Sequence, residues 1–332
     1  MGTNLTPAGI LGIGSFLPKK TITNQDIEKM VDTTDEWIIA RTGIKARRVV
    51  DEDTATSDLA TEAAIRALKD ANVEPKEIDL IIVATITPDM AFPSTACIVQ
   101  KNLKATKAAS FDLEAACSGF LYGVAIGQQF IATGMYKKVL VIGAETMSRI
   151  VDWKDRNTCI LFGDGAGAVV LGETDEGRGI LANYMGSDGE GGKFLSVPAG
   201  GSRMPATIET IHEGLQYVKM DGSEVFKFAV RIMGKAAEEA LKISGHTIED
   251  IDYLVPHQAN IRIVEAASKR LKLPKDKIHV NLDKYGNMSA ASVPVALDEA
   301  VKEGKIKKDD LIVLVGFGGG LTWGSCVIKW NK

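Results

Sequence analysis

The sequence predicts an α/β fold made of two similar halves, residues 1–174 and 175–332. The main observation is a set of three short matches that share one offset of 173 positions (67 to 240, 78 to 251 and 141 to 314). They pair Ala67-Leu68-Lys69 with Ala240-Leu241-Lys242, Ile78-Asp79 with Ile251-Asp252, and Val141-Ile142-Gly143 with Leu314-Val315-Gly316. The second observation is that residues 80–84, 139–142 and 312–315 are nearly all apolar, as in strands covered by helices on both faces. We therefore expect two layered units whose facing loops form the site.

The individual elements follow from periodicity. Apolar residues at helical spacing predict a helix over 59–68, followed by a turn over 72–76 and a strand over 78–83. The second half repeats this order, with a helix over 225–241 and a strand over 251–255. A strand over 108–113 and an apolar helix over 118–133 flank Cys117. Residues 184–224 are rich in glycine and charge, and we expect an insertion or a flap there.

Composition excludes several classes of protein. The chain has 332 residues, 45% hydrophobic and 25% charged, which is typical of a globular protein with an ample core. A net charge of −4 argues against a general nucleic-acid binder. We expect a cytoplasmic protein, because residues 1–18 do not look like a signal peptide and no apolar run approaches membrane-spanning length. The spacing of the cysteines and histidines predicts reduced thiols and no protein metal site. These residues are Cys97, Cys117, Cys159, Cys326, His212, His246, His257 and His279.

Cys117 is the strongest candidate for a reactive residue. It lies in Glu-Ala-Ala-Cys-Ser-Gly-Phe, between the predicted strand and the predicted helix. The unpaired N–H groups at a helix N-terminus favour negative charge, so this position is expected to lower the thiol pKa and favour a nucleophilic thiolate. A free cysteine can also be a small buried apolar residue, so Cys117 alone does not decide the question.

Two downstream residues complete a possible catalytic set. His257 follows the predicted strand over 251–255, and Asn287 lies in Tyr-Gly-Asn-Met-Ser, between an extended stretch and a helix. Asn287 is separated from Cys117 by 170 positions (117 to 287), close to the repeat offset. A lone histidine after a strand is usually structural, and an asparagine after glycine is usually a turn residue. Equivalent loops of two related halves would nevertheless bring Cys117, His257 and Asn287 together.

Glycine-rich segments offer one further candidate. Residues 316–320, Gly-Phe-Gly-Gly-Gly, come just after the predicted strand over 312–315. They form either a tight turn or a backbone that approaches a reacting carbonyl and offers N–H groups to an oxyanion. Residues 163–167 and 12–14 superficially suggest nucleotide-binding loops, but neither completes Gly-x-Gly-x-x-Gly between a strand and a helix.

Taken together, these motifs resemble the thiolase superfamily, and most closely bacterial β-ketoacyl-acyl-carrier-protein synthase III. The resemblance covers essentially the whole chain. It rests on Asp35-Glu36-Trp37, Arg41-Thr42-Gly43-Ile44, the Ala-Cys-Ser-Gly loop, residues 162–167, Pro256-His257-Gln258-Ala259-Asn260, Gly286-Asn287 and residues 318–324. Thiolases carry a second catalytic cysteine where this chain has Gly316, and the elongating synthases use a histidine where it has Asn287. The family implies a five-layered αβαβα dimer with the triad Cys117, His257 and Asn287.

The same resemblance implies roles for other residues. Trp37 would stack on the adenine of coenzyme A, near Arg41 and Arg156. Thr42, Gly222, Phe226, Ala259 and Asn260 would line the pantetheine tunnel. Phe162 would line the acyl pocket, and Phe92 would reach across the dimer interface to close the pocket of the partner. Asn157 replaces a glycine that is common beside Arg156 in the family, which leaves the adenine contacts open.

The implied reaction is a decarboxylative Claisen condensation that initiates fatty acid biosynthesis. Cys117 would take the acyl group from a short acyl-CoA, with the N–H groups of Cys117 and Gly319 as the oxyanion hole. His257 and Asn287 would then stabilise the enolate formed from malonyl-acyl carrier protein. Coenzyme A is a substrate here, and no cofactor is expected. The carrier is acidic in this family, so we expect a basic docking patch at Lys227, Arg231, Arg262, Lys269 and Arg270.

Other functions remain open from the sequence. A polyketide-type or quinolone-type enzyme of the same superfamily would use the same triad. The order Cys, His, Asn also occurs in papain-like cysteine proteases, although Cys117 is far from the N-terminus and the α/β duplication is foreign to that fold. A nicotinamide dehydrogenase would rest on the glycine clusters alone. The choice of primer, acetyl or branched, is not encoded in any motif.

Overall fold

The computed structural model describes residues 5–332 and is built around two mixed β-sheets. The first sheet has the strand order β1-β7-β6-β4-β5. Its strands are β1 (Ala8–Phe16), β4 (Leu80–Ala84), β5 (Ala109–Leu113), β6 (Lys138–Thr146) and β7 (Asp164–Glu173). Strand β4 is parallel to β5 and β6, whereas β7 is antiparallel to both of its neighbours. The strands predicted over 78–83 and 108–113 are thus confirmed.

The second sheet has the strand order β11-β12-β13-β8. Its strands are β8 (Gly179–Ser187), β11 (Tyr253–Pro256), β12 (Leu311–Gly318) and β13 (Thr322–Lys329). Strand β12 is longer than the apolar run 312–315 suggested, because its backbone pairs with β13 as far as Gly318. The expectation that residues 316–320 follow the strand was wrong for Gly316, Phe317 and Gly318. The division of the chain into duplicated halves at residue 174 stays a prediction.

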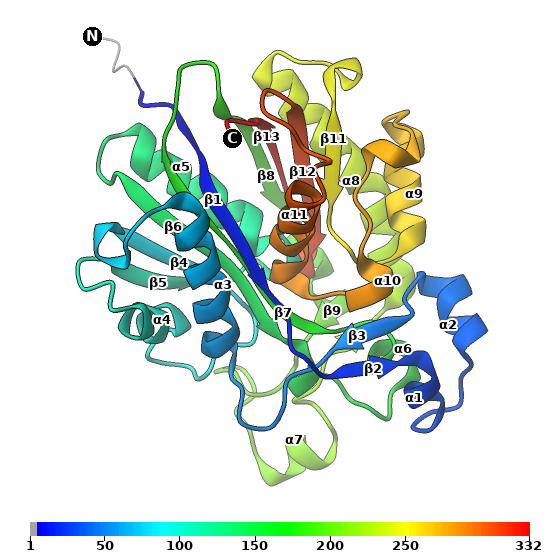
Figure 1. The fold of residues 1–332 in the computed structure, drawn as a ribbon. Coiled ribbons are helices and arrows are strands. Elements are labelled where there is room, and N and C mark those ends of the chain that lie inside the picture. Colours follow the sequence, from blue (N-terminus) through cyan, green and yellow to red (C-terminus); the bar gives the residue numbers. More distant parts are fainter. Residues whose placement is uncertain (1–4) are drawn as a thin grey trace.

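Helices cover both sheets in a five-layered αβαβα arrangement, as predicted (Figure 1). The helices α3 (Thr56–Ala71) and α4 (Thr95–Leu103) pack on the outer face of the first sheet. The helices α8 (Gly222–Ser244) and α9 (Ile261–Arg270) pack on the outer face of the second sheet. Between the sheets lie α5 (Gly119–Ala132) and α11 (Ser292–Lys302). The helices predicted over 118–133 and 225–241 correspond to α5 and α8.

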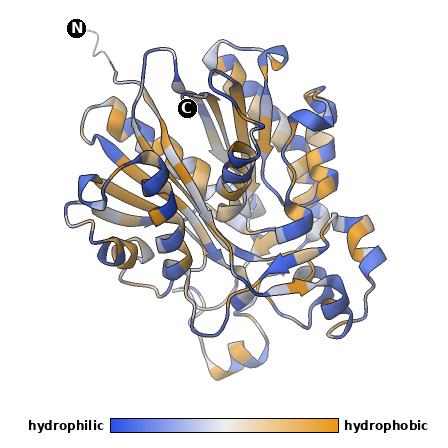
Figure 2. Cartoon of the chain, in the orientation of Figure 1, coloured by the Kyte–Doolittle hydropathy of each residue, from blue (hydrophilic) through white to orange (hydrophobic). Residues whose placement is uncertain are grey.

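The side chains of each buried strand alternate between the central helices and the outer helices. In β4, Leu80 and Ile82 contact the central helices, whereas Ile81 and Val83 contact the outer helices α3 and α4. Successive strand side chains point to opposite faces, so a strand buried on both sides must be apolar throughout. Figure 2 shows the same pattern, with hydrophobic strands inside and hydrophilic residues on the outward faces of the helices.

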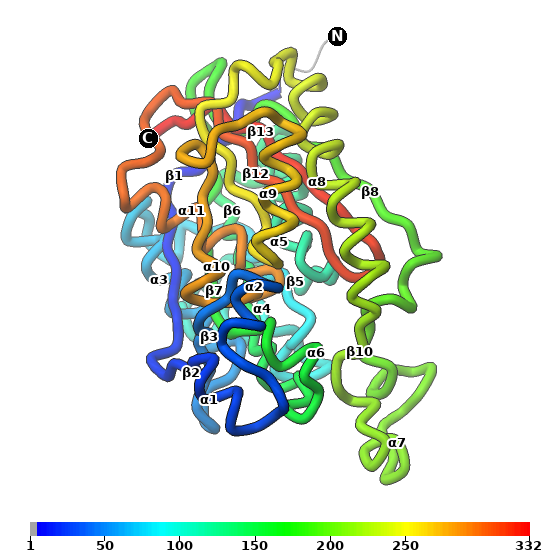
Figure 3. Tube along the Cα trace, turned by 90° about the vertical axis from the view of Figure 1, so that its right-hand side faces the viewer, coloured from blue at the N-terminus to red at the C-terminus, as the bar shows by residue number. Residues whose placement is uncertain are grey.

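The remaining elements are short and gather at one end of the two sheets (Figure 1). They are β2 (Thr21–Thr23), α1 (Asn24–Glu28), α2 (Asp35–Thr42), β3 (Ala46–Arg48), α6 (Arg156–Cys159), β9 (Leu195–Ser196), α7 (Ile208–His212), β10 (Lys219–Met220) and α10 (Leu282–Tyr285). Short 3₁₀ turns include Ala116–Ser118, Gly189–Phe194, Ser289–Ala291 and Gly319–Leu321. Helix α7 lies between β9 and β10 in the chain, in the segment where we expected an insertion or flap, and Figure 3 shows it projecting from the body below β10.

No helix within residues 5–332 is both long enough and apolar enough to cross a membrane. We expected that the first 18 residues are not a signal peptide. Four of these residues, 1–4, lie outside the described residues.

Candidate active site

Cys117 lies at a sharp bend between the first sheet and the central helix α5. The chain leaves β5, passes Ala116 with a φ of 45°, and enters the 3₁₀ turn Ala116–Ser118 directly before α5. Gly318 of β12 packs against this bend: a Cβ on Gly318 would lie 2.6 Å from the backbone nitrogen of Cys117. The two sheets therefore meet at Cys117, and only glycine allows β12 to approach this closely.

The thiol of Cys117 is buried, with 6% of the residue exposed. Burial raises its pKa to about 12, and the negative charges of Glu145 and Glu114 raise it as well. Our expectation that the helix N-terminus would lower this pKa was therefore wrong, because loss of solvent outweighs the favourable backbone groups. The Ser289 hydroxyl acts in the opposite direction and favours the thiolate. A proton must accordingly leave the thiol during any reaction in which its sulfur is the nucleophile.

His257 follows β11 directly, as the sequence predicted. Its backbone N–H donates to the Val315 carbonyl at 2.8 Å, which extends the pairing of β11 with β12. The ring packs edge-on against Phe317, with centroids 5.5 Å apart, and neither ring nitrogen has a hydrogen-bond partner. Burial lowers the pKa of His257 to about 3, so the imidazole is neutral near pH 7 and can donate one N–H.

Asn287 reaches the same place from a loop before α11. Its backbone pairs with the 161–163 segment, through Asn287 N–H to the Leu161 carbonyl (2.8 Å) and Gly163 N–H to the Asn287 carbonyl (3.0 Å). The side-chain Oδ1 accepts the Ser289 N–H at 2.8 Å. This bond assigns the amide orientation and leaves Nδ2, a donor, for the cavity.

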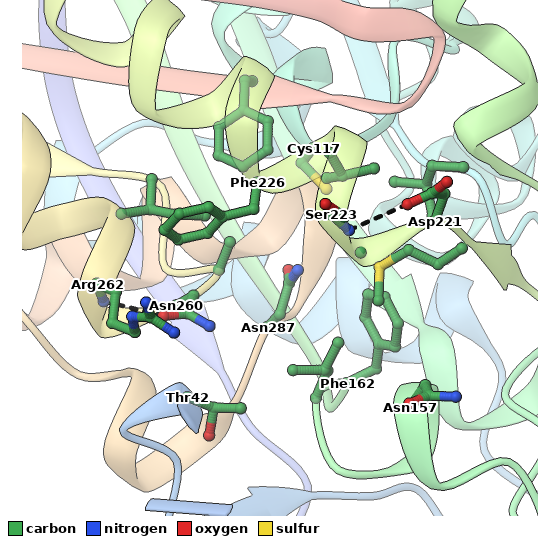
Figure 4. A pocket seen from close by; sticks show the side chains of 18 of the residues that line it. Thr42, Cys117, Asn157, Phe162, Asp221, Ser223, Phe226, Asn260, Arg262 and Asn287 are labelled. Carbon is green, nitrogen blue, oxygen red and sulfur yellow. Dashed lines mark hydrogen bonds between the residues drawn. The ribbon is translucent and has the colours of Figure 1, made fainter. Parts of the chain in front are cut away.

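One cavity of about 870 Å³ joins the three side chains. Cys117, His257 and Asn287 all line it. Figure 4 shows Cys117 and Asn287 together with Phe162, Phe226 and Asn260, which line the same cavity. The spatial arrangement predicted for Cys117, His257 and Asn287 is thus present. Trp37 and Arg41 line the same cavity from α2, far in sequence from the triad.

A second cavity of about 730 Å³ also reaches Cys117. Its lining is largely apolar, and Gly319 and Phe162 belong to it. Further members are Ile86, Met90, Met147, Leu195, Val197 and Val218. Cys117 and Phe162 line both cavities, so the thiol lies where the two cavities meet.

Comparison with known proteins decides the family. Residues 111–189 match the family "3-Oxoacyl-[acyl-carrier-protein (ACP)] synthase III", and residues 241–330 match the C-terminal region of the same enzymes. A β-ketoacyl-[acyl-carrier-protein] synthase III of Caldanaerobacter subterraneus is 65% identical over 98% of both chains. The corresponding enzyme of Clostridioides difficile is 60% identical over 98% of this chain and 99% of its own. The chain belongs to the β-ketoacyl-[acyl-carrier-protein] synthase III family. A crystal structure of the 3-oxoacyl-[acyl-carrier-protein] synthase III of Aquifex aeolicus superposes with a TM-score of 0.91 at 49% identity, covering 97% of this chain and 100% of that one.

Membership in the synthase III family rules out the papain-like protease and the nicotinamide dehydrogenase considered above. The side-chain groupings that a protein metal site would need are also missing from the described part of the chain. Residues 5–332 contain no cluster of three or more His, Cys, Asp or Glu side chains that could hold a metal ion.

The predicted coenzyme A residues gather around the large cavity. Seven of the eight line it, namely Trp37, Arg41, Thr42, Gly222, Phe226, Ala259 and Asn260. Arg156 does not line it, but its guanidinium lies 4.9 Å from the centre of the Trp37 ring, and that of Arg41 lies 5.4 Å away. Asn157, the departure from the family pattern, also lines the cavity.

The predicted docking residues lie on α8 and α9 and are exposed, but they are not equivalent. Lys227 and Arg262 line the large cavity, whereas Arg231, Lys269 and Arg270 do not. Lys227 is paired with Glu224 at 2.7 Å, and Arg270 with Glu238 at 2.6 Å.

Phe92 lies in neither cavity. It is 84% exposed, whereas its neighbours Met90 and Ala91 line the second cavity.

Sequence reasoning missed four polar residues near the thiol and the mouth. Lys193 and Lys219 line the large cavity from the inserted segment, where no periodicity predicted their position. Ser289 lines the second cavity and contacts the triad. Glu145, at the end of β6, is completely buried next to it. The available signal for Glu145 was a carboxylate that directly follows the apolar run 139–144.

Proposed function

We propose that this synthase III condenses a short acyl-CoA primer with malonyl-acyl carrier protein to give a 3-ketoacyl carrier protein, coenzyme A and CO₂. The observation that carries the proposal is the single cavity that connects Cys117, His257 and Asn287 to a mouth of aromatic and cationic side chains. Such a mouth suits the adenine and phosphates of coenzyme A, because aromatic rings stack on bases and guanidinium groups pair with phosphates.

In the first stage, Cys117 attacks the thioester carbonyl of the primer and coenzyme A leaves. The backbone N–H groups of Cys117 and Gly319 are the proposed oxyanion hole. Removing one such donor typically costs about 10²–10³ in rate. Trp37 stacks on the adenine, while Thr42, Gly222 and Phe226, with Ala259 and Asn260, line the path of the pantetheine arm. Asn260 Nδ2 donates a hydrogen bond to the Arg41 carbonyl (3.0 Å), which connects this lining to α2.

In the second stage, malonyl carrier protein enters the same cavity. A neutral His257 and the Nδ2 of Asn287 donate hydrogen bonds to its thioester carbonyl and stabilise the enolate that forms as CO₂ leaves. Both groups are suited to this role, since His257 is neutral and unpartnered and Asn287 has its acceptor oxygen already engaged. The enolate then attacks the acyl group on Cys117. No external base is needed, because decarboxylation generates the nucleophile.

We also propose that the second cavity holds the acyl group. It reaches Cys117 on the side that carries Gly319, and its apolar lining suits a short aliphatic chain. Phe162 would form part of its wall. In a homodimer, Phe92 of each copy would close the pocket of the other, which accounts for an aromatic side chain that is 84% exposed beside a cavity wall. An apolar pocket distinguishes acyl groups by about 1–3 kcal/mol per methylene.

For the acidic carrier protein, we propose that Arg231, Arg262 and Lys269 form the main docking patch. Arg270 contributes less, because its guanidinium makes two hydrogen bonds to Glu238. Lys227 lies between the patch and the cavity and would meet the phosphate of the carrier's prosthetic arm. The fatty-acid role is favoured over a polyketide role by the 65% identity to a relative named as a synthase III.

The test is acylation followed by condensation. The chain is incubated with acetyl-CoA or isobutyryl-CoA, and the acyl mass is located by peptide mapping. Wild type and Cys97→Ala, the exposed-cysteine control, should carry one acyl group on Cys117 and release a 3-ketoacyl carrier once malonyl carrier protein is added. Cys117→Ala should carry none. Acylation of Cys117→Ala at the wild-type level would refute the covalent step, and competition between the two primers would define the primer class.

A further inference from the structure

Glu145 is a carboxylate that the condensation mechanism does not use. It is the residue before the last one of β6, is 0% exposed, and its negative charge raises the pKa of the Cys117 thiol. Its oxygens accept hydrogen bonds from Thr85 Oγ1 (3.0 Å), Thr87 Oγ1 (2.6 Å) and the Ile86 N–H (3.1 Å), with the Ala290 N–H at 3.5 Å. All of these partners are neutral, so the structure pairs this buried carboxylate with no cation among residues 5–332.

Ser289 lies next to both groups: it lines the second cavity together with Cys117, and the N–H of the following residue, Ala290, points to Glu145 Oε1 at 3.5 Å. Ser289 is fully buried, and its backbone has a φ of 46°, the left-handed region that costs a non-glycine residue free energy. That backbone directs its N–H to Asn287 Oδ1. Its hydroxyl has no hydrogen-bond partner of normal geometry, yet it favours the charged forms of both the Cys117 thiol and the Glu145 carboxyl. A hydroxyl can donate to one group and accept from another, so Ser289 can connect the two.

A connection between Cys117 and Glu145 would allow the thiol to lose its proton without adding a second buried negative charge. Glu145 opposes ionisation of Cys117, because a thiolate beside a carboxylate would place two negative charges in a region without solvent. Transfer of the thiol proton to Glu145 avoids this, since the pair keeps one negative charge throughout. The other titratable group of the triad, His257, is held neutral by burial and is a poor proton acceptor. Glu114 also faces Cys117 and opposes its ionisation, and its carboxylate accepts the Ala116 N–H.

We propose that Glu145, acting through the Ser289 hydroxyl, accepts the proton of Cys117 when the enzyme is acylated and returns it when the product forms. This inference rests on the proposed function. In acylation, the S–H bond breaks and the proton moves to Ser289 Oγ, while the Ser289 proton moves to Glu145. The sulfur electron pair forms the bond to the thioester carbon. The bond from that carbon to coenzyme A then breaks, and coenzyme A leaves as a thiolate that takes a proton from solvent.

The return step closes the cycle. When the enolate of the malonyl carrier attacks the acyl group, the bond between the acyl carbon and the Cys117 sulfur breaks, and sulfur leaves as a thiolate. Glu145 gives its proton to Ser289 Oγ as the Ser289 proton moves to sulfur. The enzyme is restored with a neutral thiol and a charged carboxylate, and the net proton uptake is the one taken by coenzyme A.

The pKa of Glu145 agrees with this role. Burial raises it to about 7, and the hydroxyls of Thr87, Ser289 and Thr85 together with the Ile86 N–H limit the rise. A group with a pKa near the working pH can both accept and release a proton. Because Glu145 must be ionised to accept, the acylation rate should rise with pH through about 7.

The experiment measures the two half-reactions separately in the full-length enzyme. Acyl-Cys117 formation from acetyl-CoA is followed by rapid quench and mass spectrometry across a pH range that extends well to both sides of about 7. Decarboxylation of malonyl carrier protein without primer is followed as CO₂ release. The variants are Glu145→Gln, Ser289→Ala and Ser289→Gly; glycine adopts a φ of 46° without strain and so keeps the N–H bond to Asn287. Ser292→Ala is the control, because this neighbouring hydroxyl accepts only the Met288 N–H.

Loss of a proton acceptor typically costs about 10²–10⁴ in rate. We expect acylation at pH about 7 to fall about 10²-fold in Glu145→Gln, Ser289→Ala and Ser289→Gly, with loss of the inflection, while decarboxylation changes by less than about threefold. Ser292→Ala should retain the wild-type profile. Equal losses in both half-reactions would overturn the proposal in favour of a structural role, and so would a wild-type acylation rate without an inflection. If wild type does not acylate at all, the proposed function itself fails, and this result is distinct from the others.

Discussion

Gly318→Ala tests whether the close approach of the two sheets positions Cys117, the proposed nucleophile. A Cβ at Gly318 would lie 2.6 Å from the Cys117 nitrogen and 3.1 Å from the Ala115 carbonyl oxygen, and both are backbone atoms that no rotamer change can move. Ordinary contact begins at 3.4 Å, so the strand and the Cys117 bend would have to separate by about 0.8 Å. A misplacement of about 1 Å in a reacting group can cost about 10²-fold in rate.

The assay follows acyl-Cys117 formation from acetyl-CoA, with thermal unfolding measured in parallel. We expect acylation by Gly318→Ala to fall about 10²-fold, together with a loss of stability of about 1–3 kcal/mol from overpacking. Gly319→Ala is the matched control, because a Cβ there meets Ala116 Cβ at 3.4 Å and the Leu195 carbonyl oxygen at 3.5 Å, both ordinary contacts. It keeps the proposed oxyanion N–H and should lose less than about fivefold. Wild-type acylation by Gly318→Ala, or equal damage in both variants, would refute the reasoning.

Three further outcomes are expected. Trp37→Ala should raise the KM for acyl-CoA by about 5–150-fold, the equivalent of about 1–3 kcal/mol of base stacking, and leave the KM for malonyl carrier protein within about twofold. Lys269→Glu should raise the KM for malonyl carrier protein at low salt and leave that for acyl-CoA unchanged. The control Lys69→Glu changes an exposed lysine on α3, which packs on the other sheet, and should change neither. Glu145→Gln should gain stability relative to wild type, by about 3 kcal/mol, as pH rises from about 4.5 to about 8. The pKa of Glu145 is raised in the folded state, so its contribution to wild-type stability is complete below pH about 4.5 and is lost as pH rises through about 7. The free energy of unfolding, measured for both proteins at about pH 5 and about pH 8, tests this.

The fold could be predicted because its signals are local and repeated. The apolar run of β4 and the helical spacing of α3 follow directly from burial on one or both faces. The 173-residue offset predicted that His257 follows a strand, and the similar 170-residue separation predicted that Asn287 corresponds to Cys117. The roles of Trp37 and the tunnel residues came from family resemblance, since no periodicity connects α2 with a cavity in the second half of the chain.

The electrostatics of the site could not be predicted from sequence. A cysteine at a helix N-terminus indicated a lowered pKa, yet the structure buries Cys117 against β12 and places Glu145 near it, and both raise that pKa. Burial depends on the packing of two sheets that are far apart in the chain. The left-handed backbone of Ser289 could not be predicted from the sequence either, because a serine does not indicate a positive φ.

Burial acts on the three ionisable groups of this site in one direction, toward their neutral forms. It raises the pKa of the Cys117 thiol and of the Glu145 carboxyl, and it lowers that of His257. A neutral imidazole is what enolate stabilisation requires, but a neutral thiol is the wrong form for attack. The same desolvation that prepares the second half-reaction therefore hinders the first. The proposed proton acceptor, Glu145, would resolve this conflict without admitting water, which would hydrolyse the acyl-enzyme and compete for the donors of His257 and Asn287.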